Sequence, residues 1–319
     1  MKIAICGVWH VHAVGYAKDA LACAEVIGFY EGDAEKAAAF ANATGISQFA
    51  TLDELLESDA EGVIVCTSSD THADVMVKIA EAKKDIFTEK VLALTDEDCE
   101  RVEKAVNENG VRFVISLFQK YDGALMRAKE IVDSGELGKI NYVRFRNCHT
   151  GSIDNKLPKH FYDAKECGGG AMIDLGAHGM YIIDWILGTP LAAKSVFTLA
   201  CDRDDVAEKN TDKVEDNAVT VMSYADGAIA INETSFVSRY YPRTLEIGGE
   251  NGRVEVNGSN IVKVTVATKG KPEIITPLES LPKPIIQFLT GSILPGCGMK
   301  EAKALTHMMV MAYGDVAKN

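Results

Sequence analysis

The sequence predicts an α/β protein with two domains: an N-terminal doubly wound parallel sheet, and a C-terminal α+β domain with a large, open, mostly antiparallel sheet. From Lys2 to about Leu117, short β-type runs alternate with helical patterns, which is typical of right-handed βαβ units. From Ala218 to Ala267, strand-like runs follow one another with only turn residues between them, as in an antiparallel sheet. A chain of 319 residues also exceeds what one hydrophobic core usually organises.

Five short apolar runs define the expected parallel sheet. Two of the helices between them begin with cap signals, at Thr51 and Thr95. The expected strands are Lys2–Cys6, Val26–Tyr30, Gly62–Cys66, Asp85–Thr88 and Arg112–Leu117. The pattern changes near residue 121, so the expected domains are 1–121 and 122–319.

The second domain is expected to combine helices with a meandering sheet. Its expected helices cover Asp122–Ser134, a segment through Asp174 to Leu187, and Lys300–Ala317. Its expected strands are Ile140–Arg146, Ala218–Tyr224, Ala228–Phe236, Arg243–Ile247, Gly252–Val256 and Ile261–Ala267. The apolar alternation of this sheet has few partners within the chain, so we expect a homodimer or homotetramer formed through it.

Composition excludes several classes of partner. The net charge of −13 argues against nucleic acid and anionic membranes. The eight cysteines never approach C-x-x-C spacing and are expected to be reduced. The chain starts without a signal-like apolar core and has no stretch near the ~18 apolar residues of a membrane span. These observations predict a cytoplasmic protein with a small-molecule substrate.

The loop after the first strand is a weak match to a dinucleotide-binding motif. In a G-x-G-x-x-G pattern the glycines allow the backbone to approach a pyrophosphate, but here only the first is present. The expected cofactor contacts in this loop are Gly7, Val8, Trp9, His10 and Val11. Backbone N–H groups at the following helix start can still face an anion.

An acid at the end of the second strand supports the same interpretation. Glu31 follows Gly7 by 24 residues, close to the ~20 expected for a carboxylate that binds ribose hydroxyls. Such a carboxylate repels a 2′-phosphate, so NAD is expected and NADP is disfavoured. The alternative is that Glu31 only opens the next helix. The first domain is therefore interpreted as a dinucleotide-binding Rossmann domain.

Further cofactor contacts are expected where the third and fourth strands end. In an open parallel sheet, ligands bind at the carboxyl ends of the strands. The residues at these two positions are Thr67, Ser68, His72, Glu89 and Lys90. For His72 the alternative is an ordinary surface histidine in the first turn of a helix.

A glycine run precedes an acid and an imidazole four residues apart. Asp174 and His178 would share one face of a helix, and Lys90 completes a set able to handle protons. An unperturbed histidine at ~6.5 lies nearer neutrality than lysine at ~10.4, so His178 is the preferred general acid or base. Lys90 would then stabilise the substrate oxygen, and Asp174 would orient the imidazole or hold a hydroxyl. Lys90 acting as the base is the open alternative.

The Asp174 and His178 pair has two other interpretations. An isolated pair of this kind is most simply an exposed helix pair. A metal site that gathers His149 and His160 with them lacks any known ligand spacing, so no metal is expected. Contacts to substrate are assigned to His12, His160 and Tyr162, the last two in the polar segment after Cys148.

Several segments together resemble the Gfo/Idh/MocA oxidoreductases, named for glucose-fructose oxidoreductase and inositol dehydrogenase. The resemblance covers nearly the whole chain. It rests on Ile3–Gly7, Cys66–His72, Glu89-Lys90, Gly168–His178, Glu215–Ala218 and Leu245–Gly252. It implies a nicotinamide-binding Rossmann domain and a second domain whose open sheet forms the oligomer interface. It also implies that Lys90, Asp174 and His178 act on a substrate hydroxyl.

The sequence departs from the family pattern at several positions. The usual proline after the glutamate-lysine pair is Val91, and the usual proline after Thr67 is Ser68. The family's asparagine and two arginines align with Phe118–Lys120. These departures affect the expected contacts near the nicotinamide and the substrate.

The sequence thus predicts an NAD-dependent oxidoreductase that transfers a hydride between nicotinamide and a hydroxyl carbon of a sugar, polyol or related compound. Two other functions remain open. One is a dinucleotide-binding sensor that has lost catalysis, suggested by the incomplete glycine motif. The other is a glycosidase that oxidises and re-reduces its substrate with bound NAD.

Overall fold

The computed structural model describes residues 1–201, 214–292, 295–314 and 316–317. The chain forms two compact units. The first comprises Met1–Leu117 and Pro282–Thr306, and the second comprises Phe118–Leu281 and His307–Asn319. A division at residue 121 gives each domain one continuous stretch, whereas in the structure a C-terminal segment belongs to the first unit. The reason is local packing, because α10 (Pro284–Thr290) lies against α1 (Ala13–Cys23).

The first unit contains a five-stranded parallel sheet in the order β2-β1-β3-β4-β5. This is the doubly wound arrangement, and the order changes direction between β1 and β3. The strands are β1 (Lys2–Cys6), β2 (Glu25–Tyr30), β3 (Gly62–Val65), β4 (Asp85–Thr88) and β5 (Phe113–Ile115). The remaining helices of the unit are α2 (Ala34–Thr44), α3 (Leu52–Glu57), α4 (His72–Glu81) and α5 (Asp96–Asn109). Only β5 is clearly shorter than expected.

Local sequence explains why these elements form. The central strands are almost continuously apolar, as strands covered by helices on both faces must be, and Ile3, Ile5 and Ile64 are fully buried. The predicted caps are confirmed: Thr51 accepts the backbone N–H of Glu54 at 3.1 Å, and Thr95 accepts that of Asp98 at 3.1 Å.

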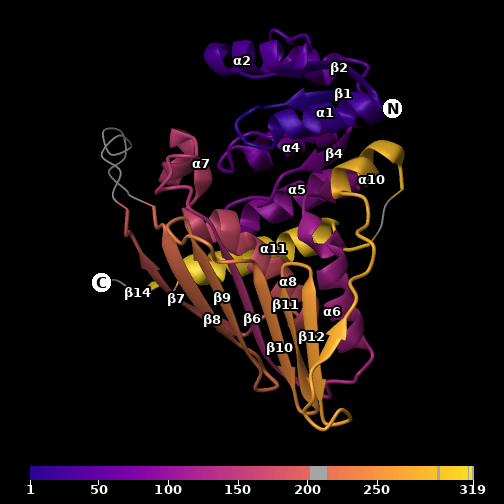
Figure 1. Ribbon diagram of the computed structural model, residues 1–319. Coiled ribbons are helices and arrows are strands. Elements are labelled where there is room, and N and C mark those ends of the chain that lie inside the picture. Colours follow the sequence, from indigo (N-terminus) through magenta and orange to yellow (C-terminus); the bar gives the residue numbers. More distant parts are fainter. Residues whose placement is uncertain (202–213, 293–294, 315, 318–319) are drawn as a thin grey trace. The chain divides into compact units, whose positions relative to one another are not determined.

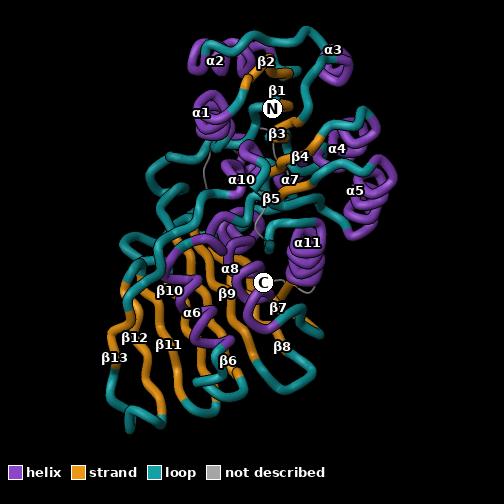
Figure 2. Tube along the Cα trace, turned by 90° about the vertical axis from the view of Figure 1, so that its right-hand side faces the viewer, coloured by secondary structure: helices purple, strands orange, loops and turns teal. Residues whose placement is uncertain are grey.

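The second unit is built on a nine-stranded sheet in the order β13-β12-β11-β10-β6-β9-β8-β7-β14 (Figure 2). Most neighbours are antiparallel, but β6 pairs with β9 and β14 with β7 in parallel. The strands are β6 (Ile140–Cys148), β7 (Ala192–Thr198), β8 (Asn217–Ser223), β9 (Ile229–Ser235), β10 (Thr244–Gly249), β11 (Gly252–Asn257), β12 (Asn260–Thr265), β13 (Glu273–Ile275) and β14 (Val316–Ala317). The mostly antiparallel sheet is therefore confirmed, and three strands that the sequence did not predict, β7, β13 and β14, extend it at its two edges.

Helices cover one face of this sheet. Its α6 (Gly123–Asp133) packs on β11 and β12, and α8 (Ala177–Leu187) packs on β6 and β9 (Figure 1). The other elements are η1 (Phe118–Tyr121), η2 (Lys159–Tyr162), α7 (Ala164–Cys167), η3 (Met172–Gly176) and α11 (Met299–Gly314), of which the last spans both units. The period of two in β8 buries Ala218, Thr220 and Met222 under the helices and leaves Val219 and Val221 exposed on the open face.

Two expectations about helices need correction. The helix through Asp174 does not start as an α-helix, because η3 (Met172–Gly176) is a π-helical turn that leads into α8. The last helix ends at Gly314 rather than Ala317, because Val316 and Ala317 pair with β7. Among the helices that the structure describes, none combines the length and apolarity that a membrane crossing requires.

Candidate functional site

The loop after β1 passes very close to the loop after β3. Gly7 has φ 78°, and a Cβ atom there would lie 2.5 Å from Cγ2 of Thr67. The backbone N–H of His10 donates to the carbonyl of Cys66 at 3.1 Å. Glycine is therefore required at position 7, even though the second and third glycines of the usual motif are missing.

Glu31 is the second anchor of this loop. Its carboxylate accepts the backbone N–H of Val8 at 2.9 Å and that of Asp33 at 2.9 Å. The acid at the end of β2 therefore lies next to the loop after β1, where a ribose-binding carboxylate is expected. The helix that follows, α2, has Asp33 as its N-terminal cap. Glu31 is therefore not needed to cap α2.

Thr67 lies in the loop after β3, and His72 begins the helix α4 that follows this loop. The hydroxyl of Thr67 is buried and has no hydrogen-bond partner among the described residues, which fits a position that meets a ligand. The ring of His72 is buried, with Nδ1 2.8 Å from the carbonyl of Val91 and Nε2 3.1 Å from the carbonyl of Thr67. His72 is therefore not a surface histidine; it joins the loops after β3 and β4. The peptide bond between Lys90 and Val91 is cis.

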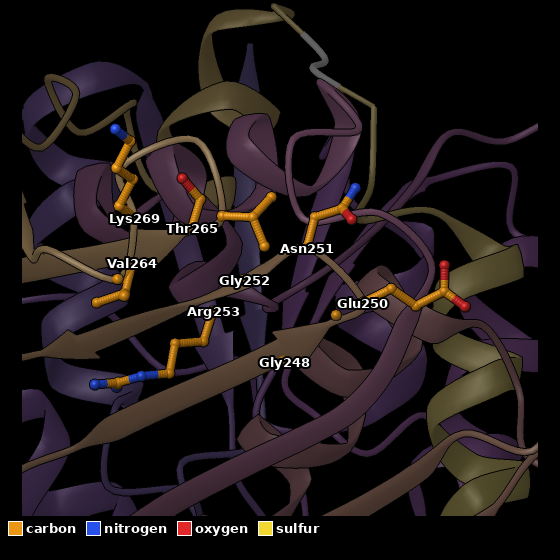
Figure 3. Close-up of a pocket in the computed structure, with 11 residues that line it drawn as sticks. Gly248, Glu250, Asn251, Gly252, Arg253, Val264, Thr265 and Lys269 are labelled. Atoms are coloured by element: carbon orange, nitrogen blue, oxygen red, sulfur yellow. The ribbon is translucent and has the colours of Figure 1, made fainter.

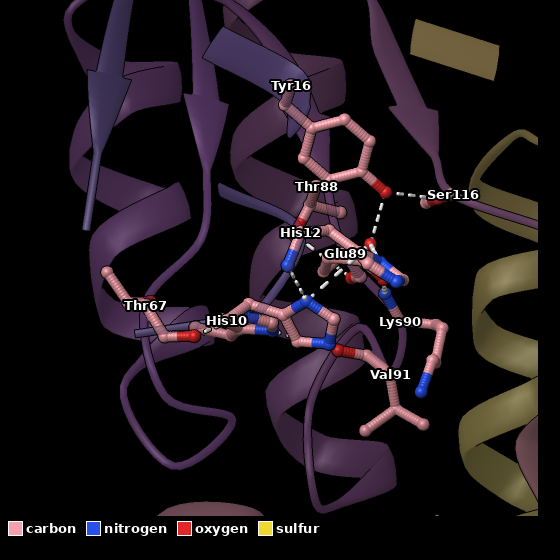
Figure 4. A network of polar contacts seen from close by, with 10 residues as sticks. His10, His12, Tyr16, Thr67, Thr88, Glu89, Lys90, Val91 and Ser116 are labelled. Carbon is pink, nitrogen blue, oxygen red and sulfur yellow. Dashed lines mark hydrogen bonds and ion pairs between the residues drawn. The ribbon is translucent and has the colours of Figure 1, made fainter. Parts of the chain in front are cut away.

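A buried carboxylate at the end of β4 gathers four polar groups (Figure 4). Glu89 is fully buried and lies 2.7 Å from Nδ1 of His12. It also accepts the hydroxyl of Tyr16 and, at 3.0 Å, the backbone N–H of Lys90. Nδ1 of His10 lies 3.8 Å away. Tyr16 was not predicted from the sequence, because its place on an apolar helix face gave no signal.

Nearby positive charges keep the Glu89 carboxylate ionised. Burial alone favours the neutral acid, but the charge of His10, together with the charge and hydrogen bond of His12, holds the pKa of Glu89 well below its ordinary value. Burial and the charge of Glu89 in turn raise the pKa of Tyr16 well above its ordinary value. Tyr16 therefore stays protonated, and its oxygen also lies 2.8 Å from the hydroxyl of Ser116.

The same cluster has the spacing of a metal site. Among the described residues, His10, His12 and Glu89 form a group whose ligand atoms lie within 4.8 Å of one another. The metal site weighed against the sequence pattern was a different set of residues, around Asp174 and His178. In the structure, hydrogen bonds from His12, Tyr16 and Lys90 already occupy the Glu89 carboxylate.

In the second unit, Asp174 and His178 lie on η3 and α8, whose beginning is held by distant groups. The carboxylate of Glu215 accepts the N–H groups of Gly170 at 3.1 Å and Met172 at 2.9 Å. The hydroxyl of Tyr313 accepts the N–H of Ile173 at 3.0 Å and donates to Glu215 at 2.8 Å. These contacts satisfy N–H groups that a helix start otherwise leaves without partners.

The glycine run before this helix follows from the same contacts. A Cβ atom on Gly169 would lie 2.0 Å from the hydroxyl of Tyr313, and one on Gly170 would lie 2.0 Å from the carbonyl of Glu215. In the sequence, Glu215 was only part of the family resemblance, and Tyr313 was not predicted. No local pattern indicated their roles.

His178 lies in a compact aromatic environment. Its side chain is 5% exposed, and Nδ1 lies 2.8 Å from the hydroxyl of Tyr181. That hydroxyl also accepts the N–H of Gln119 at 3.2 Å, and Phe118 packs edge-on against the imidazole at 5.1 Å. Oε1 of Gln119 is buried without a partner among the described residues. The segment that replaces the family's asparagine and arginines thus lines His178.

Asp174 is half-buried and acts electrostatically on His149. Burial lowers the pKa of His149, and the charge of Asp174 partly opposes this. The imidazole of His149 is stacked on Phe236 at 5.0 Å and accepts the N–H of Gly151 at 2.9 Å. His149 is therefore a further polar group near the predicted site, which the sequence analysis named only in its metal alternative.

The predicted substrate residues after Cys148 differ in accessibility. The hydroxyl of Tyr162 is bonded to Ser152 at 2.9 Å, and its side chain is buried. His160 is half-buried and packs against Phe161 at 5.4 Å. Trp9, in the first unit, is 8% exposed.

A hollow of about 720 Å³ lies elsewhere in the second unit, at the turn between β10 and β11 (Figure 3). It is lined by Gly248–Arg253, Val264–Val266, Lys269 and Gly270. None of the predicted site residues lines it. The glycine-rich segment that carried part of the family resemblance therefore forms a turn of the sheet.

The predicted site residues form two groups. The first group lies in the first unit, at the carboxyl ends of β1 to β4. Its members are Gly7, Val8, Trp9, His10, Glu31, Thr67, Glu89 and Lys90. Asp174 and His178 lie in the second unit. The acid–base set is therefore divided between the units.

Comparison with known proteins identifies the family. Residues 1–117 match an oxidoreductase family with an NAD-binding Rossmann fold, and residues 125–255 match the GFO/IDH/MocA C-terminal domain. The chain belongs to the Gfo/Idh/MocA oxidoreductases, and its first unit contains their NAD-binding Rossmann domain.

Curated relatives include inositol dehydrogenases. The chain is 27% identical over 226 residues to inositol 2-dehydrogenase of Salmonella typhimurium, covering 70% of this chain and 62% of that protein. It is 28% identical over 227 residues to scyllo-inositol 2-dehydrogenase (NAD(+)) of Bacillus subtilis, covering 70% of this chain and 64% of the relative. The matched region thus spans less than two thirds of these relatives.

Solved structures share the fold over the whole chain. An aldose-aldose oxidoreductase from Caulobacter crescentus superposes with a TM-score of 0.79 at 20% identity, covering 99% of this chain and 97% of the other. An oxidoreductase from Desulfitobacterium hafniense gives a TM-score of 0.81 at 17% identity, covering 99% and 95%. At these identities the likeness establishes the two-domain fold.

Proposed function

We propose that this protein is an NAD-dependent oxidoreductase that transfers a hydride between nicotinamide and a hydroxyl carbon of a sugar, polyol or related small molecule. The observation that carries the proposal is the arrangement at the carboxyl ends of β1 to β4. There the glycine loop lies against Glu31 and Thr67 in a domain of the NAD-binding type, and the hydroxyl of Thr67 has no hydrogen-bond partner in the described part of the chain. The curated relatives named inositol dehydrogenases support a polyol as substrate.

The chain's own residues divide the work of binding and proton handling. The proposed cofactor contacts are Gly7, Val8, Trp9, His10, Val11, Glu31, Thr67, Ser68, His72, Glu89 and Lys90. Of these, Glu89 and His72 act by holding the loops, since their polar atoms contact protein groups. When bound, NAD supplies the hydride acceptor.

Lys90, Asp174 and His178 are proposed to hold the reacting hydroxyl. A protonated Lys90 stabilises negative charge on the substrate oxygen. Asp174 accepts a substrate hydroxyl, and His178 is held at its place by Tyr181 and Phe118. His178 and Lys90 are the members of this set that can exchange the hydroxyl proton. His12, His160 and Tyr162 are proposed as further substrate contacts.

The proposal also covers the oligomeric state of the protein and its cellular compartment. The open face of the sheet carries exposed Val196, Val219, Val221 and Ile229, which favours a homodimer or homotetramer formed through that face. A net charge of −13 favours a small-molecule partner over nucleic acid. We propose a cytoplasmic protein, since all eight cysteines are free thiols.

The proposal is tested by incubating the protein with NAD and a panel of inositols, other polyols and sugars, and following NADH by its absorbance. Production of NADH with at least one polyol is expected. Nitrophenyl glycosides are included in the panel. NAD binding without NADH production, with release of nitrophenol, would show the glycosidase instead; NAD binding with neither product would show a sensor.

A further inference from the structure

A hollow of about 440 Å³ lies on the open face of the nine-stranded sheet. It is formed where the neighbouring strands β6, β9 and β7 end and where β8 begins (Figure 2). The period of two in β6 turns Phe145 towards the helices, and it turns Arg144, Arg146 and Cys148 towards the open face. None of the predicted site residues lines this hollow, so it is a candidate for a second ligand site.

Two arginines of β6 line the hollow, and carboxylates engage only one of them. Arg144 donates to the carboxylate of Glu233 from Nη2 at 2.8 Å and from Nε at 3.2 Å, and Glu246 lies 3.7 Å from its guanidinium group. Arg146 has no ion pair among the described residues, and its Nε is buried there without a hydrogen-bond partner. A buried donor without a partner costs free energy until an acceptor is supplied. Arg146 is therefore the group that indicates a ligand.

Tyr241 contacts the guanidinium group of Arg146. The centroid of its ring lies 4.8 Å from Cζ of Arg146, which is the distance of a cation–π contact. This contact supplies no oxygen acceptor for the guanidinium N–H groups. Burial raises the pKa of the Cys148 thiol to about 11, and the positive charge of Arg146 opposes the rise. The charge of Arg146 therefore acts inside the hollow, where this thiol lies.

The lining defines the class of ligand. A guanidinium group presents paired N–H donors that match the two oxygens of a carboxylate or of a phosphate. Glu233 lines the same hollow and repels a phosphate dianion more strongly than a carboxylate monoanion. The side chains of Thr198, Asn217 and Ser238 also line it and can bond to hydroxyl groups of a ligand. A volume of about 440 Å³ lies within the range of pockets that hold small molecules.

We propose that this hollow binds a small hydroxy-carboxylate of the sugar-acid type. Its carboxylate pairs with Arg146, and its hydroxyl groups bond to the polar side chains around it. The site is separate from the proposed hydride-transfer site, because His178 lies on α8, which packs on the other face of the sheet. The inference goes beyond the proposed function, since binding in the hollow needs neither NAD nor turnover.

Calorimetric titration of wild-type protein with D-gluconate, in the absence of NAD, tests the proposal. D-gluconate carries a carboxylate and a chain of hydroxyl groups, and D-glucitol is the matched polyol without the carboxylate. Gluconate should bind in a saturable manner and compete with no glucitol at this site. Inorganic phosphate, titrated in the same way, should bind more weakly than gluconate because of the charge of Glu233.

Four variants locate the binding. Arg146→Gln should weaken gluconate binding about tenfold or more, because the charge-assisted hydrogen bonds are lost. Arg146→Lys keeps the charge without the paired donors, so its affinity should lie between those of the wild type and Arg146→Gln. Arg253→Gln is the matched control on the same face, where Arg253 is paired with Glu255, and it should bind as wild type does. Asp174→Asn, in the proposed hydride-transfer site, should also bind gluconate normally.

Several results would overturn the inference. They are an absence of saturable gluconate binding at millimolar concentrations, tighter binding of phosphate than of gluconate, or equal weakening in Arg146→Gln and Arg253→Gln. Loss of gluconate binding in Asp174→Asn alone would place the ligand in the other site. If wild-type protein binds no gluconate and Arg146→Gln sediments as a smaller species, the occupant is an acidic side chain of a second copy. Gluconate binding through Arg146, without NADH production from any polyol, would refute the proposed function only.

Discussion

At the scale of single residues, Glu31 is expected to decide between the two nicotinamide cofactors. Its carboxylate lies beside the backbone N–H of Val8, where it would meet a ribose hydroxyl but repel a 2′-phosphate. Wild-type protein should bind NAD much more tightly than NADP in calorimetric titrations, and Glu31→Ala should reduce that preference. Equal affinities for the two cofactors in wild-type protein would show that Glu31 does not face the ribose.

Lys90 is expected to act on the transition state rather than on cofactor binding. In the proposed mechanism its ammonium group stabilises charge that develops on the substrate oxygen only as the proton leaves. Lys90→Met, which keeps the length of the side chain, should lower kcat by about a hundredfold to ten-thousandfold while NAD affinity stays within several-fold. Turnover near the wild-type level would remove Lys90 from the mechanism. Lys194→Met, on β7, is a suitable control.

At the scale of elements, the helix that carries Asp174 and His178 depends on Glu215. Burial raises the pKa of Glu215 above its ordinary value, and hydrogen bonds from Met172 and Tyr313 oppose the rise only in part. The native state therefore binds this proton more tightly than the unfolded chain. The contribution of Glu215 to stability is largest below the unfolded pKa and falls as the pH rises through the native pKa.

Glu215→Gln removes this titration while keeping an oxygen that can accept the helix N–H groups. The free energy of unfolding of wild-type protein, relative to the variant, should fall as the pH rises from about 4 towards neutrality. Urea unfolding at several pH values measures the difference. Tyr313→Phe is the control, because it loses a hydrogen bond but no group that titrates in this range. A difference independent of pH would contradict the assignment.

At the scale of the whole molecule, the open face of the nine-stranded sheet is expected to be an interface between copies of the chain. Val219 is 39% exposed and Val221 is 43% exposed, and both point away from the helices. Sedimentation should show a dimer or tetramer at micromolar concentration. Val221→Asp should shift it towards monomer, because a carboxylate would be buried without a partner. Leu21→Asp, at an exposed position on α1, should leave the association unchanged. A wild-type monomer would refute the prediction.

Much of the architecture followed from local pattern. Apolar runs such as Lys2–Cys6 alternate with helices at Thr51 and Thr95 that begin with their own caps, so each βα unit is specified by neighbouring residues. The spacing of Glu31 from Gly7 likewise predicted that the acid would lie beside the loop after β1, and it does. Short-range periodicity and capping determined these features.

The tertiary structure alone decided which buried polar groups meet. His12 and Glu89 are 77 residues apart, and Tyr313 and Glu215 are 98 residues apart, yet each pair is in direct hydrogen-bond contact. A buried polar group must find a partner, but its residue type does not say which distant segment will supply one. The sequence by itself therefore determined the two sheets and the edge at which we propose that a dinucleotide binds. Long-range close approach decided how the acids and histidines at that edge are held, because hydrogen bonding depends on distances that no local pattern encodes.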